Sequence, residues 1–585
     1  MLHIIQSSVF PKFSLCSQID LYFRNNQFAN LNINESIFTL EKLGKISTDT
    51  YFNSVSVGKW KKYTNVDDLN FTIKFKGKIK IIWHLHRLHF SHKLLEEMYF
   101  DNIELSEITF PLNFWKDLDA GMLSFDIEAL SEAELHSFSY STKSENINNI
   151  SLGVVITHFN RQQYVLPALE RLKNELLLDP NFKDKVSLNV VDNSQNLPEI
   201  DNVNIIPNEN LGGSGGFTRG LMYLKEQGTY SHCLFMDDDA SCEVEGIKRT
   251  ISFLEHSKNP KTAIAGAMLR EAEMFRQFEN GAKFDGICKA IKPNLDLRDI
   301  HSLLINEQEE HIDYGGWWFF AFPLAEVKHY AFPYFVRGDD SGFSLVHDFN
   351  ILTLNGISSW QEDFALKNGP LPHYLDTRYH IMHHFHNFVG GTVTDIVKTT
   401  ARMCVKNLLC YQYETALASI LAMEDVAKGK EFWEANVSMS KRRPEIQSLI
   451  SAEKVIDIPY EISANVIWGN PNEGRIAKLF RWLSLNGHLL PTVFFKKGTV
   501  WQNKGYGGSL REIYRYNKVL YIHWPTQKGF ILEHNKKKFF SYLMRYTKAM
   551  YQLYKNYNRL KKEYQNSYDE LTSTEFWKKQ FKQDQ

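Results

Sequence analysis

Between about residues 149 and 390, short apolar runs alternate with helical stretches, and this alternation restricts the fold more than any other feature of the sequence. The runs LGVVITHF and VSLNVVDNS are separated by a helical pattern from Tyr164 to Leu178. Strands that alternate with helices predict a parallel sheet within an α/β domain. Such sheets bind ligands beyond the carboxyl ends of their strands. The residues that directly follow the apolar runs are therefore the first site candidates: Thr157, Asp192, Asn210 and Asp237.

The sequence on either side of this region has a different pattern. At 585 residues the chain is longer than one hydrophobic core usually supports, so several domains are expected. Alternating runs such as FTIKFKGKIKIIW predict a β-sandwich (jelly-roll-like) domain over residues 1–148. Residues 149–390 then form the α/β domain, and long helical patterns predict a mainly helical domain over residues 391–585.

Composition excludes several classes of protein. A net charge of -1 gives no global basic surface, so a nucleic-acid partner is not expected. The six cysteines lack paired CxxC spacing and are interpreted as reduced thiols. The N-terminus does not resemble a signal peptide and no long uncharged apolar run is present, so a cytoplasmic location is expected.

The tail from Lys536 to Lys582 interleaves basic and aromatic residues. One interpretation is a set of amphipathic helices that pack on the preceding domain, and we favour it slightly. The other is a surface that lies on anionic lipid at the inner face of the plasma membrane. Peripheral membrane contact and a homo-oligomeric state both stay open.

The strongest local signal is CLFMDDDAS, in which an apolar strand runs directly into three carboxylates. Because burying three like charges without compensation costs several kcal/mol each, a cation is expected there. Oxygen ligands suit Mg²⁺ or Mn²⁺. Since alternate residues of an extended segment project to the same side, Asp237 and Asp239 can share one ion while Asp238 points elsewhere. A solvated helix cap is the less favoured alternative.

Upstream of the triplet lies NENLGGSGGFTRG, a glycine-dense turn that opens a helix. Glycines let backbone amides approach a ligand closely, and a helix N-terminus favours an anion. The segment lacks the GK[ST] ending of a phosphate-binding Walker loop, which argues against an ATPase. Alone the segment is a weak signal, because flexible turns are common, but its place one helix before the acidic triplet strengthens the prediction of an anion site.

Two further motifs suggest a place for a second substrate. In IDYGGWWFFAFP, Trp317 and Trp318 stand among glycines that are expected to expose their rings for stacking on sugar faces; two core tryptophans are the alternative. In YFVRGDDSGFS, Asp340 is the candidate general base, with a capping carboxylate as the alternative.

Histidines cluster in RYHIMHHFH, at positions that can share a helical face. They are His380, His383, His384 and His386. No HExxH motif accompanies them, so zinc hydrolysis is not favoured and a ligand role is the minor interpretation.

Taken together, seven motifs resemble the galactofuranosyltransferases related to the mycobacterial galactan polymerase, within glycosyltransferase family 2. The motifs are THFNR, VVDNS, NENLGGSGG, FMDDDA, GGWWFF, FVRGDD and SSWQEDF. Their order and approximate spacing agree over roughly residues 150 to 390, and TYFNSVSVGKWKKYTNV is similar to the N-terminal β-sandwich module of that family. The C-terminal region matches least.

The resemblance implies a GT-A nucleotide-diphospho-sugar transferase domain with UDP-galactofuranose as donor. It implies inverting transfer to a hydroxyl of a galactose-containing glycan, which builds a cell-surface polysaccharide; lipid linkage of the acceptor is left open. The implied donor-binding residues are Thr157, Phe159, Arg161, Asp192, Asn210, Gly212, Gly213 and Asp238. Asp237 and Asp239 would hold Mn²⁺ or Mg²⁺, Asp340 would be the general base, and the acceptor would contact Trp317, Trp318 and Asp339.

The sequence departs from the family at two positions. Gln361 follows Trp360 where the family has a metal-binding histidine, and we include it as a third ligand because its carbonyl oxygen can coordinate a hard cation. Gly342 stands where relatives often carry an acidic residue, which affects acceptor recognition. A transferase for another UDP-sugar and a glycan-binding protein with a degenerate transferase domain remain the rival interpretations.

Overall fold

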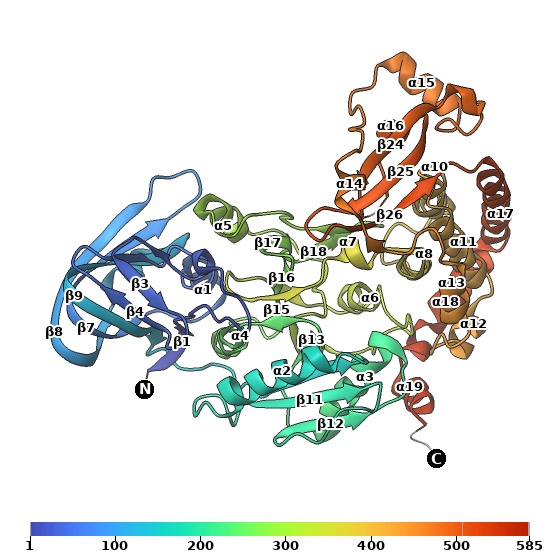
Figure 1. Cartoon of the computed structure of the whole chain (residues 1–585). Helices are drawn as coiled ribbons and strands as arrows, with labels where there is room; N and C mark the ends of the chain where they lie inside the picture. The colour runs from blue at the N-terminus through green and yellow to red at the C-terminus, as the bar shows by residue number, and fades with distance from the viewer. Residues whose placement is uncertain (1, 506, 583–585) are drawn as a thin grey trace.

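The computed structural model describes residues 2–505 and 507–582 and shows three regions that follow one another along the chain (Figure 1). A sheet-rich N-terminal region lies at one end, a mixed α/β region occupies the centre, and helices with a projecting small sheet form the other end. We propose that these regions correspond to the domains 1–148, 149–390 and 391–585 expected from the sequence. All six cysteines are free thiols.

The N-terminal strands join into one antiparallel nine-stranded sheet that curls over its own core. The longest strand, β9 (Met122–Thr142), pairs with β7 (Asn70–His86) on one side and with four short strands on the other. Alternate residues such as Phe71 and Trp83 point inward and are fully buried. The remaining elements are β1 (His3–Ser7), β2 (Arg24–Asn25), β3 (Ala29–Asn32), β4 (Ile37–Leu40), β5 (Lys45–Ser47), β6 (Val55–Ser56), α1 (Val57–Tyr63) and β8 (Lys93–Pro111).

A seven-stranded mixed sheet forms the centre, in the order β12-β11-β10-β13-β20-β15-β21. Its first four strands are parallel, and their nearly unbroken apolar sequences suit strands covered on both faces. The strands are β10 (Leu152–His158), β11 (Val186–Asp192), β12 (Val203–Pro207), β13 (His232–Asp237), β15 (Thr262–Ala265), β20 (Phe320–Pro323) and β21 (Asn350–Leu352). The register sets Thr157 beside Asp237 and His158 beside Asp192, so the predicted carboxyl edge exists.

Helices and a second sheet surround this edge. The helices are α2 (Gln162–Leu172), α3 (Gly212–Gln227), α4 (Val244–His256), α5 (Ile300–Glu307), α6 (Asp339–Val346), α7 (Phe364–Lys367) and α8 (Pro370–Phe385). The second sheet has the order β14-β22-β16-β17, and a two-stranded sheet follows it. These strands are β14 (Ser241–Cys242), β16 (Ala267–Arg270), β17 (Glu273–Glu279), β18 (Ala282–Phe284), β19 (Cys288–Ala290) and β22 (Ser358–Gln361). Because Ser241 pairs with Trp360, the β22 strand carries Gln361 to the acidic triplet.

The C-terminal region contains a four-stranded sheet, β23-β26-β25-β24, that the sequence patterns did not reveal. Its strands are β23 (Ile456–Asp457), β24 (Lys496–Asn503), β25 (Tyr516–His523) and β26 (Lys528–Glu533). The helices are α9 (Val393–Thr400), α10 (Lys406–Leu409), α11 (Tyr413–Val426), α12 (Lys430–Ala435), α13 (Arg442–Leu449), α14 (Tyr460–Ser463), α15 (Arg475–Leu483), α16 (Leu510–Ile513), α17 (Lys536–Lys555), α18 (Tyr557–Leu571) and α19 (Thr574–Gln580).

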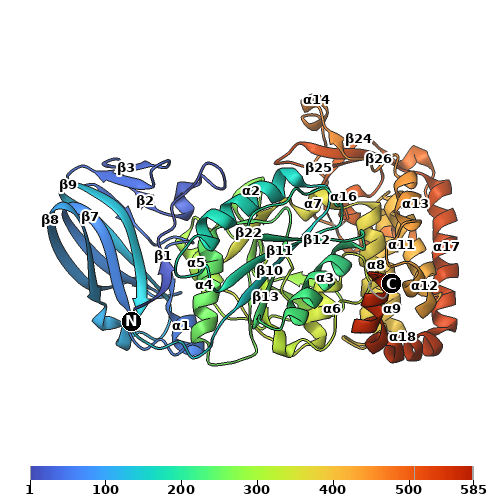
Figure 2. The ribbon, with the colours of Figure 1, turned by 90° about the horizontal axis from the view of Figure 1, so that it is seen from below.

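The basic, aromatic tail packs on the rest of the molecule. Helix α17 lies against α11, α18 lies against α8, and α19 reaches α3. Leu553, Leu560 and Trp577 are buried in these contacts. Figure 2 shows α17 and α18 at the end of the molecule opposite the long strands β7, β8 and β9. These contacts support the packing interpretation of the tail. Within the described residues, no helix has both the length and the apolar character needed to span a membrane.

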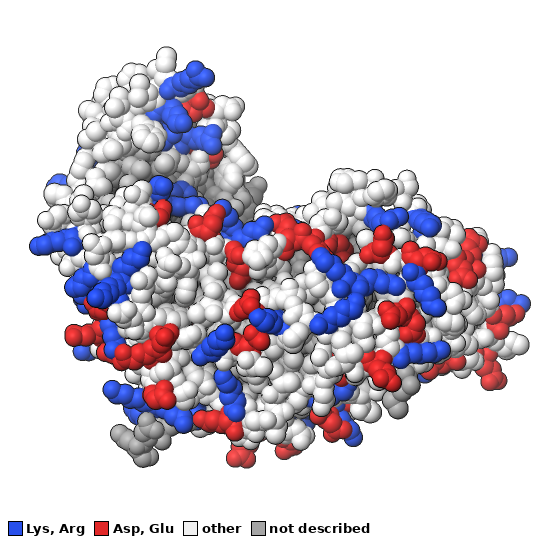
Figure 3. Space-filling model, turned by 180° about the vertical axis from the view of Figure 1, so that it is seen from behind, with Lys and Arg blue, Asp and Glu red and all other residues white. Residues whose placement is uncertain are grey.

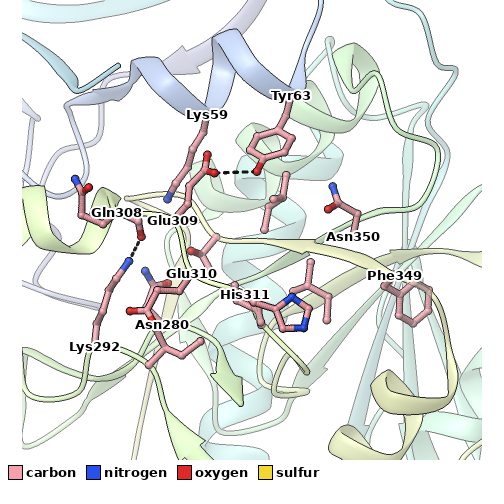
Figure 4. Close-up of a pocket in the computed structure, with 15 residues that line it drawn as sticks. Lys59, Tyr63, Asn280, Lys292, Gln308, Glu309, Glu310, His311, Phe349 and Asn350 are labelled. Atoms are coloured by element: carbon pink, nitrogen blue, oxygen red, sulfur yellow. Dashed lines mark hydrogen bonds between the residues drawn. The ribbon is translucent and has the colours of Figure 1, made fainter. Parts of the chain in front are cut away.

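The N-terminal region is fixed to the central one by buried contacts. Arg249 Nη2 donates to the Phe52 carbonyl oxygen at 3.0 Å, and the Ser7 N–H donates to Glu245 Oε1 at 2.6 Å. A cavity at the same junction is closed on one side by α1, where Tyr63 donates to Glu309 Oε2 at 3.1 Å (Figure 4). None of the residues predicted to form the site lines this cavity.

Candidate active site

The acidic triplet lies where β13 leaves the central sheet, and its first carboxylate lacks a partner. Asp237 is the last residue of β13, and its carboxylate forms no hydrogen bond or ion pair within residues 2–505 and 507–582. Burial, followed by repulsion from Asp239 and Asp238, raises the pKa of Asp237 well above its usual range. An uncompensated, half-buried carboxylate of this kind is a favourable ligand for a cation.

The third carboxylate is compensated by two cations of the chain itself. Asp239 Oδ2 lies 2.8 Å from Lys367 Nζ and 2.6 Å from an Arg161 guanidinium nitrogen. Burial alone would raise the pKa of Asp239, but Lys367 and Arg161 more than offset it, so the pKa lies below its usual value. Lys367, at the end of the short helix α7, was not among the residues singled out from the sequence.

The middle carboxylate is turned towards the end of β10. Asp238 Oδ2 accepts the Phe159 N–H at 2.9 Å and lies 3.2 Å from His158 Nδ1. Asp238 Oδ1 accepts from Arg161 at 3.2 Å. These contacts connect the turn after β10 to the turn after β13, so Asp238 and Arg161 hold the two turns together at the carboxyl edge of the sheet.

The donor atoms at this edge fit a hard divalent cation. Gln361 is 2% exposed and its amide Nε2 has no hydrogen-bond partner in the described part of the chain. Since the two ends of an amide are interchangeable in such an assignment, the atom without a partner can equally be the amide oxygen. Both ion pairs of Asp239 use Oδ2. Two carboxylates and one amide oxygen are ligands that Mg²⁺ and Mn²⁺ accept. The described residues contain no group of three His, Cys, Asp or Glu side chains placed to hold a metal.

The other predicted donor residues line the same edge, although two of them also organise the backbone. Asp192 accepts four backbone N–H groups, from Ser194 to Leu197, at 2.8–3.0 Å. Burial would raise its pKa, but these bonds lower it below the usual value. Asn210 accepts the Gly212 N–H at 3.0 Å. The Thr157 hydroxyl is buried with no partner in residues 2–505 and 507–582, so it is free to meet a ligand.

The glycine-dense segment packs closely on protein backbone. Gly212 begins α3 with φ +73°, and a Cβ there would lie 2.1 Å from the Phe335 carbonyl oxygen. The Ser214 N–H donates to that same oxygen at 2.9 Å, and the Ser214 hydroxyl donates to Asp339 Oδ2 at 3.0 Å. Gly212 and Gly213, the two glycines predicted to lie beside the donor, pack against the segment that leads into Asp339 and Asp340. Whether they also contact a donor stays a prediction.

This close approach gives a matched pair of substitutions. Gly212→Ala and Gly228→Ala both place a Cβ at positive φ, +73° and +67°, but only Gly212 is crowded, since nothing lies within 4 Å of a Cβ at Gly228. We expect Gly228→Ala to lower the free energy of unfolding by about 1 kcal/mol. Gly212→Ala should cost about 2–4 kcal/mol because overpacking adds to the strain. Chemical denaturation of both variants measures the difference; equal losses would contradict the packing role of Gly212.

Asp340 faces a cavity of about 320 Å³. Gly338, at φ +80°, starts α6 and places Asp339 and Asp340 in its first turn. Burial raises the pKa of Asp340 to about 6, even though the Ser341 N–H and the Arg337 guanidinium favour the carboxylate. Burial and the charge of Asp340 raise the pKa of Asp339 too. A carboxylate with a pKa near neutrality is suited to general base catalysis.

Two further carboxyl groups line the cavity that no sequence motif indicated. Glu279, at the end of β17, has a buried Oε1 without a partner in the described chain, and burial with the charge of Asp340 raises its pKa to about 8. Asp376 on α8 also has an unpartnered buried oxygen and a pKa raised by burial. At neutral pH Glu279 is therefore a hydrogen-bond donor while Asp340 is mainly an acceptor.

The tryptophan pair is not exposed as the sequence suggested. Trp317 is 5% exposed and Trp318 is 6% exposed. Trp317 packs among Phe217, Phe235 and Phe343 in the core, with ring centroids 4.9–5.7 Å apart. Trp318 lines the cavity, but its ring N–H donates to the Gly266 carbonyl oxygen at 3.1 Å and is not free for a sugar hydroxyl. The expectation of two exposed rings was wrong because the two side chains point to opposite sides of the chain and other residues cover both sides.

The clustered histidines are buried beside the cavity, and His380 lines it. His383 bonds the Ser341 hydroxyl at 3.0 Å and the Tyr334 hydroxyl at 3.2 Å, so it supports the turn that carries Asp340. His384 bonds Thr399 at 3.0 Å, and His380 bonds the Asp376 carbonyl oxygen at 2.7 Å. Burial lowers the pKa of His380, His383, His384 and His386 below the usual value. These neutral, engaged rings favour the structural interpretation.

Two family models match separate parts of the chain. Residues 153–324 match the model "Glycosyl transferase family 2", and residues 11–143 match "Galactofuranosyltransferase 2 N-terminal". The central region therefore contains a family 2 glycosyltransferase domain with the GT-A fold, as the motifs predicted. The sheet-rich N-terminal region and the largely helical C-terminal part complete the predicted fold class.

The particular relatives confirm the resemblance to galactofuranosyltransferases. The chain is 23% identical over 423 residues to galactofuranosyltransferase GlfT2 of Mycolicibacterium smegmatis, covering 66% of this chain and 64% of the relative. It is 22% identical over 428 residues to GlfT2 of Mycobacterium tuberculosis, covering 66% of each. The chain thus spans slightly less than two thirds of these relatives. The substrates and partners of this chain are therefore stated below as proposals.

Solved structures show weaker likeness. A mannosyltransferase from Pyrobaculum calidifontis, in complex with GDP-Man and Mn²⁺, is 11% identical with a TM-score of 0.28, covering 52% of this chain and 85% of that one. GalNAc-T7 with UDP, GalNAc and Mn²⁺ is 10% identical with a TM-score of 0.28, covering 53% of this chain and 60% of that one. These TM-scores are too low for a detailed structural comparison.

Proposed function

We propose that the chain is a metal-dependent, inverting galactofuranosyltransferase that moves galactofuranose from UDP-galactofuranose to a hydroxyl of a galactose-containing glycan. The observation that carries this proposal is the physical link between the two halves of the site. The hydroxyl of Ser214 joins the start of α3, on the donor edge, to Asp339 beside Asp340 in the cavity. The donor class and the acceptor class follow the two GlfT2 relatives.

The chain's own groups support a single displacement. Asp340 accepts the proton of the acceptor hydroxyl, and protonated Glu279 and the Trp318 ring hold the acceptor in the cavity. Thr157, Phe159 and Arg161 line the side where the nucleotide binds. Direct attack by the acceptor needs no covalent enzyme intermediate, so the anomeric configuration inverts.

Asp237, Asp239 and Gln361 would hold the metal. When bound, Mn²⁺ or Mg²⁺ stabilises the negative charge on the departing diphosphate. Lys367 and Arg161 already supply positive charge to Asp239. These two side chains hold the acidic edge in place before substrate arrives.

A donor and acceptor panel tests the proposal. The purified chain is incubated with Mn²⁺, galactoside acceptors and either UDP-galactofuranose or UDP-galactopyranose, and the product linkage is analysed. We expect incorporation from UDP-galactofuranose with inversion. Incorporation from UDP-galactopyranose alone would establish a transferase for another UDP-sugar. Acceptor binding without metal-dependent UDP release would establish a glycan-binding protein.

The raised pKa of Asp340 predicts an acid limb in the pH profile. Asp340 accepts a proton only as the carboxylate, so kcat/KM should fall about tenfold per pH unit below its pKa of about 6. An aspartate with an ordinary pKa would keep activity down to about pH 4. Initial rates with a saturating metal concentration measure the profile, and a limb near pH 4 would contradict the burial of the base.

A further inference from the structure

The cavity between the N-terminal and central regions, which we call the junction cavity, has walls from both regions (Figure 4). Its volume is about 320 Å³, at the lower end of the range of roughly 300–1,000 Å³ that is usual for small-ligand sites. In Figure 4, Lys59 and Tyr63 extend from α1 above Asn280 and Lys292 of the central region. A molecule in this cavity would therefore contact both regions at once.

Two buried polar groups in the wall of the junction cavity lack hydrogen-bond partners. Lys59 is 5% exposed, and its Nζ donates no hydrogen bond to any described residue. The oxygen that it pairs with, Glu307 Oε1, is 3.8 Å away and already accepts the Ser56 hydroxyl at 2.7 Å. Asn280 is 2% exposed and donates to Asn306 at 2.8 Å, but its own Oδ1 has no partner in the described chain. Buried polar groups normally have partners, and a bound polar molecule can supply both.

The charges around the junction cavity favour a neutral ligand. Lys59 and Lys292 line it together with Glu309 and Glu310, so neither sign dominates. Burial, followed by the charge of Lys59, lowers the pKa of Lys292 to about 8. Seen from behind, the surface of the N-terminal and central regions likewise mixes blue and red groups without a large area of one sign (Figure 3). An anion would meet the two carboxylates, and a cation would meet the two ammonium groups.

The other side chains of the junction cavity are of the kinds that bind a saccharide. Tyr63 and Phe349 supply rings, while Gln308 and Asn350 supply amides. The C–H face of a sugar packs on aromatic rings, and each of its hydroxyls can both donate and accept a hydrogen bond. His311 also lines the cavity and its side chain is 84% exposed, so the cavity opens to solvent there. A longer glycan can therefore place one unit inside and continue outside.

The junction cavity shares a wall with the cavity that contains Asp340. Glu279 and Ala290 line the Asp340 cavity, whereas the next residues along the chain, Asn280 and Ile291, line the junction cavity. Successive side chains of an extended segment point to opposite sides. The segment that includes the end of β17 and the end of β19 therefore separates the two cavities by the thickness of a single stretch of chain.

We propose that the junction cavity binds a neutral saccharide unit of the acceptor glycan, outside the catalytic cavity. The N-terminal region then takes part in acceptor binding through Lys59 and Tyr63 of α1. Sugar hydroxyls accept from Lys59 Nζ and donate to Asn280 Oδ1. The saccharide class follows from the cavity itself, whereas the galactofuranose identity of the glycan rests on the proposed function.

Calorimetric titration of the full chain with a trisaccharide of β-galactofuranose, without donor or metal, tests this proposal. We expect Lys59→Met to raise the Kd at least about tenfold, because a hydrogen bond to a charged group is lost. Methionine has nearly the same length, so the thermal midpoint should not fall. Asn350→Ala changes a half-buried residue on another wall and should also raise the Kd. The matched control is Lys61→Met on the same helix, because Lys61 does not line the cavity and should leave the Kd unchanged.

Transfer kinetics separate this inference from the proposed function. With the trisaccharide as acceptor, Lys59→Met should raise KM and leave kcat unchanged. Absence of transfer from UDP-galactofuranose, with trisaccharide binding that still depends on Lys59, would reject the proposed function and leave the saccharide site standing. The site itself is overturned if the trisaccharide does not bind, if neither Lys59→Met nor Asn350→Ala weakens binding, or if Lys61→Met weakens it equally. Binding of inorganic phosphate that is lost in Lys59→Met, with trisaccharide binding unchanged, would identify an anion site and would also overturn it.

Discussion

Replacement of Asp340 by asparagine should leave UDP binding intact and reduce sugar transfer by about 10²- to 10⁴-fold, the usual contribution of a general base. The amide preserves the shape of the side chain but cannot accept the acceptor proton. Asp340 lines the cavity, and among the described residues its link to the donor edge runs through its neighbour Asp339, which accepts from Ser214. Nucleotide affinity should therefore change little.

The measurements are calorimetric titration with UDP and initial transfer rates from UDP-galactofuranose. Asp348→Asn is a suitable control, because this exposed carboxylate only pairs with Lys261 on the surface. The control should transfer sugar at the normal rate. Near-normal transfer by the Asp340→Asn variant would reject Asp340 as the base, whereas loss of UDP binding would show that the substitution disturbs the donor edge.

Replacement of Asp237 by asparagine should reduce transfer at least as strongly as the change at Asp340, since metal stabilisation of the leaving group supplies several kcal/mol. Binding of Mn²⁺, followed by calorimetry or by the spin resonance of the free ion, should weaken in parallel. A chelator should abolish transfer by the unchanged protein, and added Mn²⁺ should restore it.

The same substitution should increase stability in the absence of metal. The pKa of Asp237 is raised in the folded state, so its ionisation at neutral pH favours the unfolded chain. Stability falls as pH rises from the unfolded pKa towards the folded pKa, and asparagine removes this loss. We therefore expect a higher unfolding midpoint at pH 7 than for the unchanged protein. A lower midpoint together with lost activity would show that Asp237 serves the fold and would contradict its role as a ligand.

The sequence was sufficient to predict the main elements of the catalytic region. Apolar runs buried on both faces have few alternatives to parallel strands, and the carboxyl ends of such strands meet at one edge. The register confirms this for Thr157, Asp192 and Asp237. The family resemblance rested on short motifs next to those strands, and the two matching family models confirm it.

The strand and motif patterns of the sequence could not predict contacts between distant segments. The pairing of Lys367 with Asp239 spans 128 residues, and Glu279 and Asp376 join the cavity from β17 and α8 without any motif. The C-terminal sheet was missed because its strands lie among helical patterns. Side-chain direction was also undetermined, so the sequence suggested two exposed tryptophans where the structure buries both.

The sequence by itself determined that this protein has a parallel-stranded transferase domain with three carboxylates at the end of a strand, because strand periodicity and local motifs are properties of neighbouring residues. The tertiary structure alone decided what each carboxylate does. Among the described residues Asp237 has no partner, while Lys367 and Arg161 neutralise Asp239 and the turn after β10 contacts Asp238. It also decided that α15 faces solvent with its apolar side. Burial and charge pairing depend on segments that meet only in the folded chain. Burial and charge pairing in turn set the pKa of each group and decide which apolar side chains stay exposed.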